Sequence, residues 1–167
     1  TLEIIKSNGA NVGVNTHRAN RIVEEALISN KIKSLKKILE LKREVKYGEN
    51  SRIDFLVNNN MDEEIYIEVK NVTLSLKKGI AEFPDAITER GSKHLKELQK
   101  IKSKKTRAIM LYLIQRDDCK YFQIAKKIDE KYNSNLKKAI KSGVEILCYN
   151  CKFENNKIQI DKKIKFM

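Results

Sequence analysis

The first thirty residues alternate and then repeat in ways that predict a hairpin followed by a helix. Leu2–Lys6 and Asn11–Val14 read as two short strands, because an Asn-Gly pair between them is a strong hairpin turn signal. Apolar residues then recur three and four apart, which predicts a helix that ends near Ser29 and is capped by Asn15 or Thr16. The apolar side of this helix comprises Ala19, Ile22, Val23, Ala26 and Leu27.

Three strand-like segments rich in β-branched residues follow in close succession. A short apolar stretch, Leu35–Leu41, precedes them. The strands are predicted over Arg43–Tyr47, Ser51–Asn58 and Glu64–Lys70, and Gly48–Asn50 forms the turn between the first two. Turns this short join antiparallel neighbours, so the three segments are expected to lie side by side in one sheet.

The second half of the chain alternates helices with strands. Asn71–Pro84 reads as a long connector, and Thr88 begins a helix that runs to about Lys102. Thr106–Ile114 is almost wholly apolar, which predicts a buried central strand. The remaining predicted elements are a helix over Asn133–Ser142 that ends at Gly143, a strand over Val144–Tyr149 and an edge strand in the tail to Met167.

Two of the predicted strands carry charged residues that a purely structural strand does not need. Glu68 and Lys70 share one face of their strand, roughly 6.6–6.8 Å apart along it, and Asp54 lies in the strand before. A hairpin would bring all three together at one end of the sheet. Two carboxylates suit a divalent cation, and a lysine beside the attacking water suits phosphodiester hydrolysis. The alternative is chance, because a chain with 22 acidic and 35 basic residues often carries such charges on a solvated strand face.

The order of the elements supports the chemical interpretation of these charges. Three antiparallel strands, a crossover helix and a parallel central strand give an α/β fold with a mixed β-sheet flanked by helices. This order resembles the PD-(D/E)xK, restriction-endonuclease-like core, which carries a metal carboxylate on its second strand and E-x-K on its third. Asp54 and Glu68-Val69-Lys70 fall at those positions. The resemblance implies that Asp54 and Glu68 bind Mg²⁺ or Mn²⁺, and that Lys70 orients water or stabilises charge on the phosphate.

Four further polar residues are candidates for supporting roles at this site. Glu24 and Glu25 each lie roughly 130° from the centre of the first helix's apolar face, so helical phase does not choose between them as a third ligand. Solvated charge is the ordinary interpretation of both. Glu44 is a third candidate, or equally a salt-bridge partner for a lysine. Gln115 ends the central strand, where it would either bond a metal-bound water or simply begin a loop.

The charge balance points to a polyanionic partner. The chain of 167 residues is 41% hydrophobic and 34% charged, which suits one globular domain over residues 1–167, and its net charge is +13. Nucleic acid is the first expectation and an anionic membrane surface the second. An AT-rich genome explains the preference for Lys over Arg, but not the excess of bases, which is concentrated in Ser92–Arg107. Lysine contacts phosphate more than it reads bases, so DNA binding is expected to be sequence-nonspecific.

Other features narrow the cellular setting. No apolar run approaches about 18 residues and no signal peptide opens the chain, which predicts a cytoplasmic protein that does not span a membrane. The chain starts at Thr1, as expected of a piece trimmed from a longer protein. Cys148 and Cys151 are formally a C-x-x-C pair, but no second pair completes a zinc site. Together with Cys119 they are predicted to be structural thiols.

Several longer motifs together resemble the sugar fermentation stimulation protein A (SfsA) family. They comprise Val14–Thr16, Tyr47–Phe55, Glu68–Leu74, Phe83–Leu95, Leu113–Arg116, Ile128-Asp129 and Gly143–Glu145. The resemblance implies nonspecific DNA binding, a regulatory role in sugar metabolism and a nuclease-like C-terminal domain. It also implies an N-terminal OB-like domain that this chain lacks, in keeping with its start at Thr1.

The predicted DNA contacts gather at the start of the second long helix. Thr88 reads first as its N-cap, and Arg90, Lys93 and His94 follow where the helix dipole favours phosphate. An ion pair between Glu89 and Lys93 is the alternative for part of this set. His94 is expected to contact the DNA backbone rather than act as general base. Arg52 completes the predicted contact residues.

Three functions are therefore compared. The leading hypothesis is a DNA-binding protein with a nuclease-like core that hydrolyses phosphodiester bonds with a divalent metal, as a Mg²⁺-dependent deoxyribonuclease does. The rival is a non-catalytic, sequence-nonspecific DNA-binding regulator of sugar metabolism. An RNA-binding module is the third.

Overall fold

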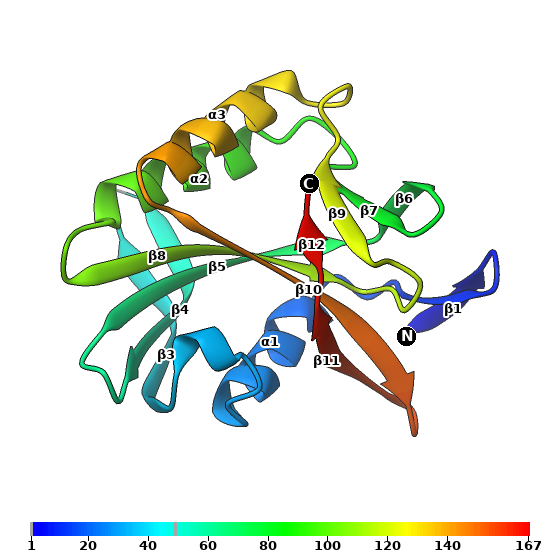
Figure 1. The fold of residues 1–167 in the computed structure, drawn as a ribbon, viewed down its shortest axis with the longest axis horizontal. Helices are drawn as coiled ribbons and strands as arrows, with labels where there is room; N and C mark the ends of the chain where they lie inside the picture. The colour runs from blue at the N-terminus through cyan, green and yellow to red at the C-terminus, as the bar shows by residue number, and fades with distance from the viewer. Residues whose placement is uncertain (1, 49) are drawn as a thin grey trace.

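A computed structural model describes residues 2–48 and 50–167. Thr1 and Glu49 lie outside the described residues, and with them the chain start and the middle of the predicted Gly48–Asn50 turn. Figure 1 shows helices on both sides of a twisted sheet, with α1 below it and α2 and α3 above it. The helices are α1 (Arg18–Ile28), the 3₁₀ turn η1 (Lys33–Leu35), α2 (Glu89–Ile101) and α3 (Glu130–Lys141).

The largest sheet has six strands in the order β11-β10-β8-β5-β4-β3. Strand β5 pairs parallel with β8, and β8 parallel with β10, while β3–β4, β4–β5 and β10–β11 are antiparallel. The predicted mixed α/β sheet flanked by helices is confirmed. Its strands are β3 (Ile38–Tyr47), β4 (Ser51–Asn59), β5 (Glu64–Val72), β8 (Thr106–Ile114), β10 (Glu145–Glu154) and β11 (Lys157–Lys163).

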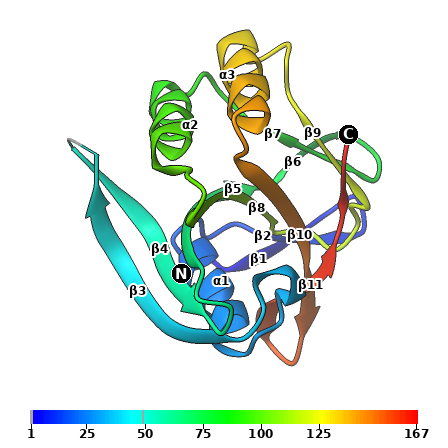
Figure 2. The same cartoon turned by 60° about the vertical axis from the view of Figure 1, so that its left-hand side comes forward.

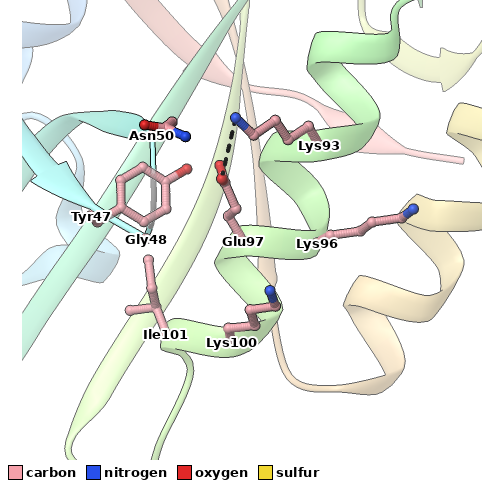
Figure 3. A pocket seen from close by; sticks show the side chains of 8 residues that line it. All are labelled: Tyr47, Gly48, Asn50, Lys93, Lys96, Glu97, Lys100 and Ile101. Atoms are coloured by element: carbon pink, nitrogen blue, oxygen red, sulfur yellow. Dashed lines mark ion pairs between the residues drawn. The ribbon is translucent and has the colours of Figure 1, made fainter.

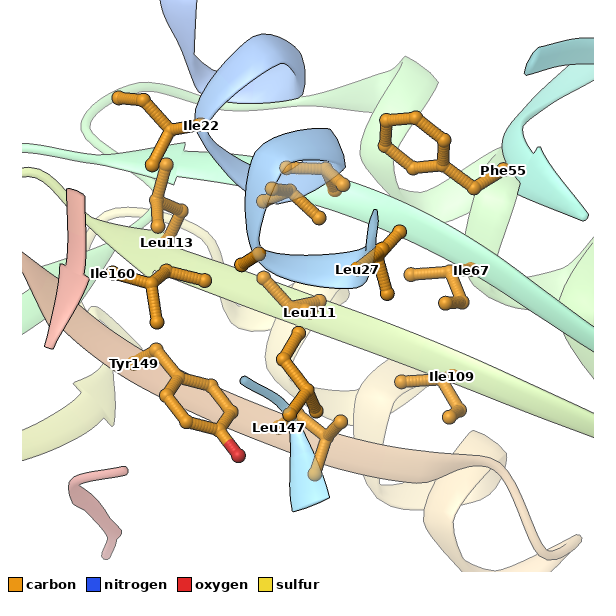
Figure 4. Packing of buried hydrophobic residues seen from close by; sticks show 14 of the residues in the cluster. Ile22, Leu27, Phe55, Ile67, Ile109, Leu111, Leu113, Leu147, Tyr149 and Ile160 are labelled. Carbon is orange, nitrogen blue, oxygen red and sulfur yellow. The ribbon is translucent and has the colours of Figure 1, made fainter. Parts of the chain in front are cut away.

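The sheet separates two hydrophobic layers. On one face, α1 packs through Leu27 against strand residues such as Leu111 and Ile67 (Figure 4). On the other, α2 and α3 cover residues such as Met110 and Tyr112. Every residue from 108 to 114 is fully buried, so β8 is the central strand that its apolar run predicts. Side chains alternate along β8, and both of its faces are therefore covered by helices.

The predicted connector over Asn71–Pro84 contains two strands instead. They belong to a four-stranded sheet in the order β12-β9-β7-β6. Strands this short gain stability from partners far along the chain, here β7 with β9, and their local pattern does not show it. The strands are β6 (Leu74–Lys77), β7 (Ile80–Phe83), β9 (Tyr121–Ile124) and β12 (Lys165–Phe166).

The ends of several elements differ from the predicted ones. Strand β3 begins at Ile38 and β10 runs to Glu154, because pairing with β4 and β11 extends both beyond their apolar cores. Helix α3 starts at Glu130, where Asp129 caps it by accepting a 2.8 Å bond from the Tyr132 N–H.

The start of the chain keeps its predicted hairpin, β1 (Ile4–Ser7) with β2 (Ala10–Gly13). Helix α1 begins at Arg18 after His17, rather than directly after Asn15 or Thr16. Asn15 Oδ1 instead accepts from the His17 N–H at 3.1 Å. Within residues 2–48 and 50–167, none of the helices has the length and apolarity needed to cross a membrane.

Candidate metal and nucleic-acid site

The candidate site begins where β4 and β5 separate. Their last paired residues are Phe55 and Ile67. Beyond this pair, the Val69 N–H donates to Asp54 Oδ2 at 2.7 Å, so a side-chain carboxylate replaces the backbone acceptor of a regular ladder. Asn20 of α1 donates to Asp54 Oδ1 at 2.8 Å. Asp54 is therefore fixed at the opening between the two strands.

A change in twist of the β3–β4 hairpin accompanies this opening. The paired residues on either side place Glu44 opposite Asp54, and Glu44 has a φ of 51°. Ile53 packs in the layer under α2, whereas Phe55 packs in the layer under α1. The hairpin thus turns from one core layer to the other at Asp54, and its end rises beside α2 (Figure 2).

Glu68 lies behind this opening and is only 3% exposed. Its Oε1 accepts from Lys70 Nζ at 2.8 Å and also contacts His94 Nδ1, while Lys70 Nζ lies 3.1 Å from that same nitrogen. Its Oε2 is buried and has no hydrogen-bond partner among the described residues. One oxygen of Glu68 is thus held in place and the other remains available to a ligand.

The two carboxylates differ in their protonation behaviour. Burial raises the pKa of Asp54, and the nearby charge of Glu68 adds to this, against the bonds from Val69 and Asn20. Burial would also raise the pKa of Glu68, but the bond with His94 and the charge of Lys70 outweigh it and lower that pKa. Glu68 is therefore the more readily ionised carboxylate of the pair.

A cleft of about 390 Å³ brings the predicted residues together. Asp54 and Glu68 line it, and so do all four residues predicted to contact DNA. Lys70 is held behind the cleft wall by Glu68 and His94. The four predicted DNA contacts in the cleft are Arg52, Arg90, Lys93 and His94.

Comparison with known proteins now identifies the family. The family described as sugar fermentation stimulation protein RE domain matches residues 17–157. This chain belongs to the SfsA family. Among its relatives, the sugar fermentation stimulation protein homolog of Rhodospirillum centenum is 45% identical over 165 residues, which is 99% of this chain and 71% of that protein. The homolog of Pelagibacter ubique is 46% identical over 167 residues, 100% of this chain and 72% of that protein.

A solved structure of similar fold is described as Pyrococcus furiosus SfsA in complex with Ca²⁺. It superposes with a TM-score of 0.89 at 26% identity, covering 99% of this chain and 71% of that one. The SfsA resemblance read from the sequence motifs is therefore confirmed over most of the chain.

The three candidate third ligands of this SfsA chain are placed differently. Glu24 forms an ion pair with Arg43 at 3.2 Å, and Glu25 forms one with Arg21 at 3.3 Å. Glu44 lines the cleft. Still, the part of the chain that the structure describes contains no group of three or more His, Cys, Asp or Glu side chains placed to hold a metal ion. The site therefore offers a pair of carboxylates.

Gln115 is not placed on the cleft. It is fully buried, and its Nε2 donates to Asn71 Oδ1 at 2.7 Å and towards the Asn15 carbonyl at 3.4 Å. Strands β8 and β5 stay in register through Ile114 and Val72, which places Gln115 beyond the site. Gln115 therefore fastens the segment before α1 to the end of β5 and begins the loop after β8, while its predicted contact with a metal-bound water stays a prediction.

The contacts at the start of α2 test the predicted N-cap at Thr88 and the alternative ion pair between Glu89 and Lys93. Thr88 Oγ1 accepts from the Gly91 N–H at 2.9 Å, which confirms the predicted N-cap. Glu89 pairs with Lys131 at 3.0 Å and not with Lys93. Lys93 lies 3.8 Å from Glu97 instead.

Asn20 is a site residue that the sequence did not suggest. It lies on α1, and as a neutral amide it matches no metal-ligand pattern. Its bond to Asp54 depends on how α1 docks on the sheet, which no local spacing reveals. The three cysteines are buried thiols, in keeping with their predicted structural role.

Proposed function

We propose that this SfsA chain binds DNA and hydrolyses phosphodiester bonds with a divalent metal, on a PD-(D/E)xK-type core. The observation that carries the proposal is the shared cleft, where the buried carboxylate of Glu68 and the half-buried carboxylate of Asp54 meet the basic side chains of Arg52, Arg90 and Lys93. Carboxylates can hold a metal and basic side chains can hold a phosphate. A cleft with both therefore suits a metal bound to a phosphate better than it suits a metal alone or a phosphate alone.

The two carboxylates fit a hard cation. Glu68 Oε2 is a buried acceptor without a partner among the described residues, and each Asp54 oxygen accepts a single bond there. Mg²⁺ commonly takes one or two carboxylates and completes its shell with water and phosphate oxygens. When bound, it would polarise the phosphate and activate water. The Ca²⁺ complex described for the Pyrococcus protein supports this assignment.

The protein side chains have separate tasks in this proposal. Lys70 is fixed by Glu68 and His94, so its ammonium group can stabilise charge on the phosphate or orient water at low entropic cost. Arg90 and Lys93 lie in the first turns of α2, where the helix N-terminus adds its own attraction for an anion.

One observation favours a second function, the non-catalytic DNA-binding regulator of sugar metabolism. Glu44, Asp54 and Glu68 all line the cleft, but among residues 2–48 and 50–167 no three His, Cys, Asp or Glu side chains are grouped to hold a metal ion. Glu68 is also neutralised by Lys70 without a metal. In this function the carboxylates shape the cleft, and the basic residues alone hold DNA.

Digestion of single-stranded, duplex and branched DNA separates the two functions. With Mg²⁺ or Mn²⁺ we expect cutting by the wild type, and in EDTA none. Asp54→Ala should abolish it, because the metal loses a ligand. Asp161→Ala is the matched control, since Asp161 is exposed on β11 at the opposite edge of the sheet. DNA binding by a wild type that cuts nothing with either metal would favour the regulator.

DNA binding in EDTA tests the basic wall of the cleft, which comprises Arg52, Arg90 and Lys93, independently of catalysis. Arg90→Gln and Lys93→Gln should each weaken binding to all sequences alike, and each should reduce the slope of log K against log salt by about one. Fluorescence anisotropy over a salt series measures both quantities. Lys157→Gln is the control, because Lys157 is exposed on β11, and it should change neither the affinity nor the slope. On duplex DNA, whose bases stay paired and stacked, a preference for one sequence that survives high salt would contradict phosphate-dominated binding.

A further inference from the structure

A second hollow, of about 570 Å³, adjoins the carboxylate cleft. It lies between the end of the β3–β4 hairpin and α2, where Tyr47 and Asn50 face Lys93 and Glu97 (Figure 3). Asn50 and Lys93 also line the carboxylate cleft, so the two hollows share a wall. A DNA strand bound at Asp54 and Glu68 would reach this hollow next.

The floor of the hollow carries two buried polar side chains, Tyr47 and Glu97, and burial together with the charges of Glu68 and Glu97 raises the pKa of the Tyr47 hydroxyl. Glu97 is 9% exposed, and its Oε1 accepts from Ser51 Oγ at 2.8 Å. Its Oε2 is buried without a hydrogen-bond partner in the described chain, and the same holds for the Tyr47 hydroxyl. Buried groups without partners are costly in a fold. Both side chains point into the hollow, as Figure 3 shows.

The rim of the hollow is basic. Lys93, Lys96 and Lys100 recur three and four apart along α2, so they follow one side of the helix. The side chain of Lys93 is 52% exposed beside a Glu97 side chain that is 11% exposed. A ligand that fits must therefore present an anion to the rim and hydrogen-bond donors to the buried carboxylate.

A nucleotide has this division of charge, with its phosphate at one end and base donors at the other. Among the four DNA bases, guanine alone places a ring N–H next to an amino group, two donors that match the two oxygens of a carboxylate. Thymine offers one N–H between two carbonyl oxygens, which a carboxylate repels. Glu97 therefore favours guanine.

We propose that this hollow binds one unstacked nucleotide of the DNA strand that passes through the carboxylate cleft. Lys96 and Lys100 hold its phosphate, and Glu97 with Tyr47 recognises the base, with guanine preferred. The assignment rests on the proposed DNA binding and adds a base-selective contact to a surface that otherwise grips phosphate.

Titration calorimetry in EDTA with deoxynucleoside monophosphates tests the assignment. Wild-type protein should bind dGMP about tenfold more tightly than dTMP, as a good bidentate pair discriminates. Glu97→Gln should reduce the difference in affinity between dGMP and dTMP to about twofold, because an amide offers one donor and one acceptor. Lys100→Gln should weaken the binding of dGMP and dTMP by the same factor. The matched control is Glu89→Gln, which removes the same charge from an exposed position on α2 and should keep the preference.

A second ligand comparison needs no variant. Deoxyinosine monophosphate lacks only the amino group of dGMP, so wild-type protein should bind it several-fold more weakly. Equal binding of dGMP, dIMP and dTMP would overturn the assignment. A labelled oligothymidylate in the same buffer reports on DNA binding itself. If it binds while the nucleotides are not distinguished, only this inference fails. If neither it nor duplex DNA binds, the proposed function fails too. A dGMP preference without DNA binding would overturn the placement on a DNA strand.

Discussion

Glu68→Gln is expected to lower metal-dependent DNA cutting by at least about a hundredfold, because a preorganised charge at the reacting centre is lost. Glutamine keeps the shape of the side chain but presents a neutral oxygen to the metal. Binding of DNA in EDTA should stay within a few-fold of wild type, since Glu68 adds little attraction for phosphate. Cleavage assays with Mg²⁺ and anisotropy in EDTA measure the two effects separately.

The direction of the binding change is itself informative. Glu68 is buried beside the basic side chains of the cleft, so removing its charge removes a repulsion of the DNA backbone and should tighten metal-free binding slightly. Glu154→Gln is the matched control, because that side chain is 64% exposed beside Lys152. Undiminished cutting by purified Glu68→Gln would point to a contaminating nuclease or another site. If the wild-type protein binds DNA but does not cut it, the non-catalytic regulator is the function that remains.

The features that the sequence predicts well are those with a strong local signal. Thr106–Ile114 is a long apolar run, and only a strand covered on both faces buries it, so β8 is found at its predicted bounds. Thr88 precedes helical periodicity and caps α2 as expected. Asp54 and Glu68 converge because short turns force β3, β4 and β5 to be neighbours.

The features that it misses depend on contacts between distant segments. Strand β9 is four residues long and is stabilised by β7, some forty positions earlier in the chain. The neighbours of Asp54 depend on a twist at Glu44, which an alternating pattern does not reveal. Gln115 is a related case: the apolar run shows that it ends β8, but the bond of its amide to Asn71 depends on how β8 and β5 pair, which the sequence does not show.

The geometry of the site also depends on the central strands beneath it. Leu111 of β8 lies opposite Val69 of β5 and Leu147 of β10 in the registered sheet. Val69 is the residue whose N–H holds Asp54, and its neighbours in the chain are Glu68 and Lys70. A cavity at Leu111 would therefore loosen the strand that carries the candidate catalytic residues.

Leu111→Ala is expected to lower the free energy of unfolding by about 3 kcal/mol, because Leu111 is fully buried and its truncation leaves a cavity in a packed layer. For a chain of this size that corresponds to a fall of roughly 6–12 °C in Tm. Leu39→Ala is the matched control, since Leu39 is 65% exposed on β3 and should change stability by less than about 0.5 kcal/mol. Urea and thermal unfolding followed by circular dichroism measure both. Equal small losses in the two variants would show that β8 is not the centre of the core, and the support it gives to Glu68 and Lys70 would have to come from elsewhere.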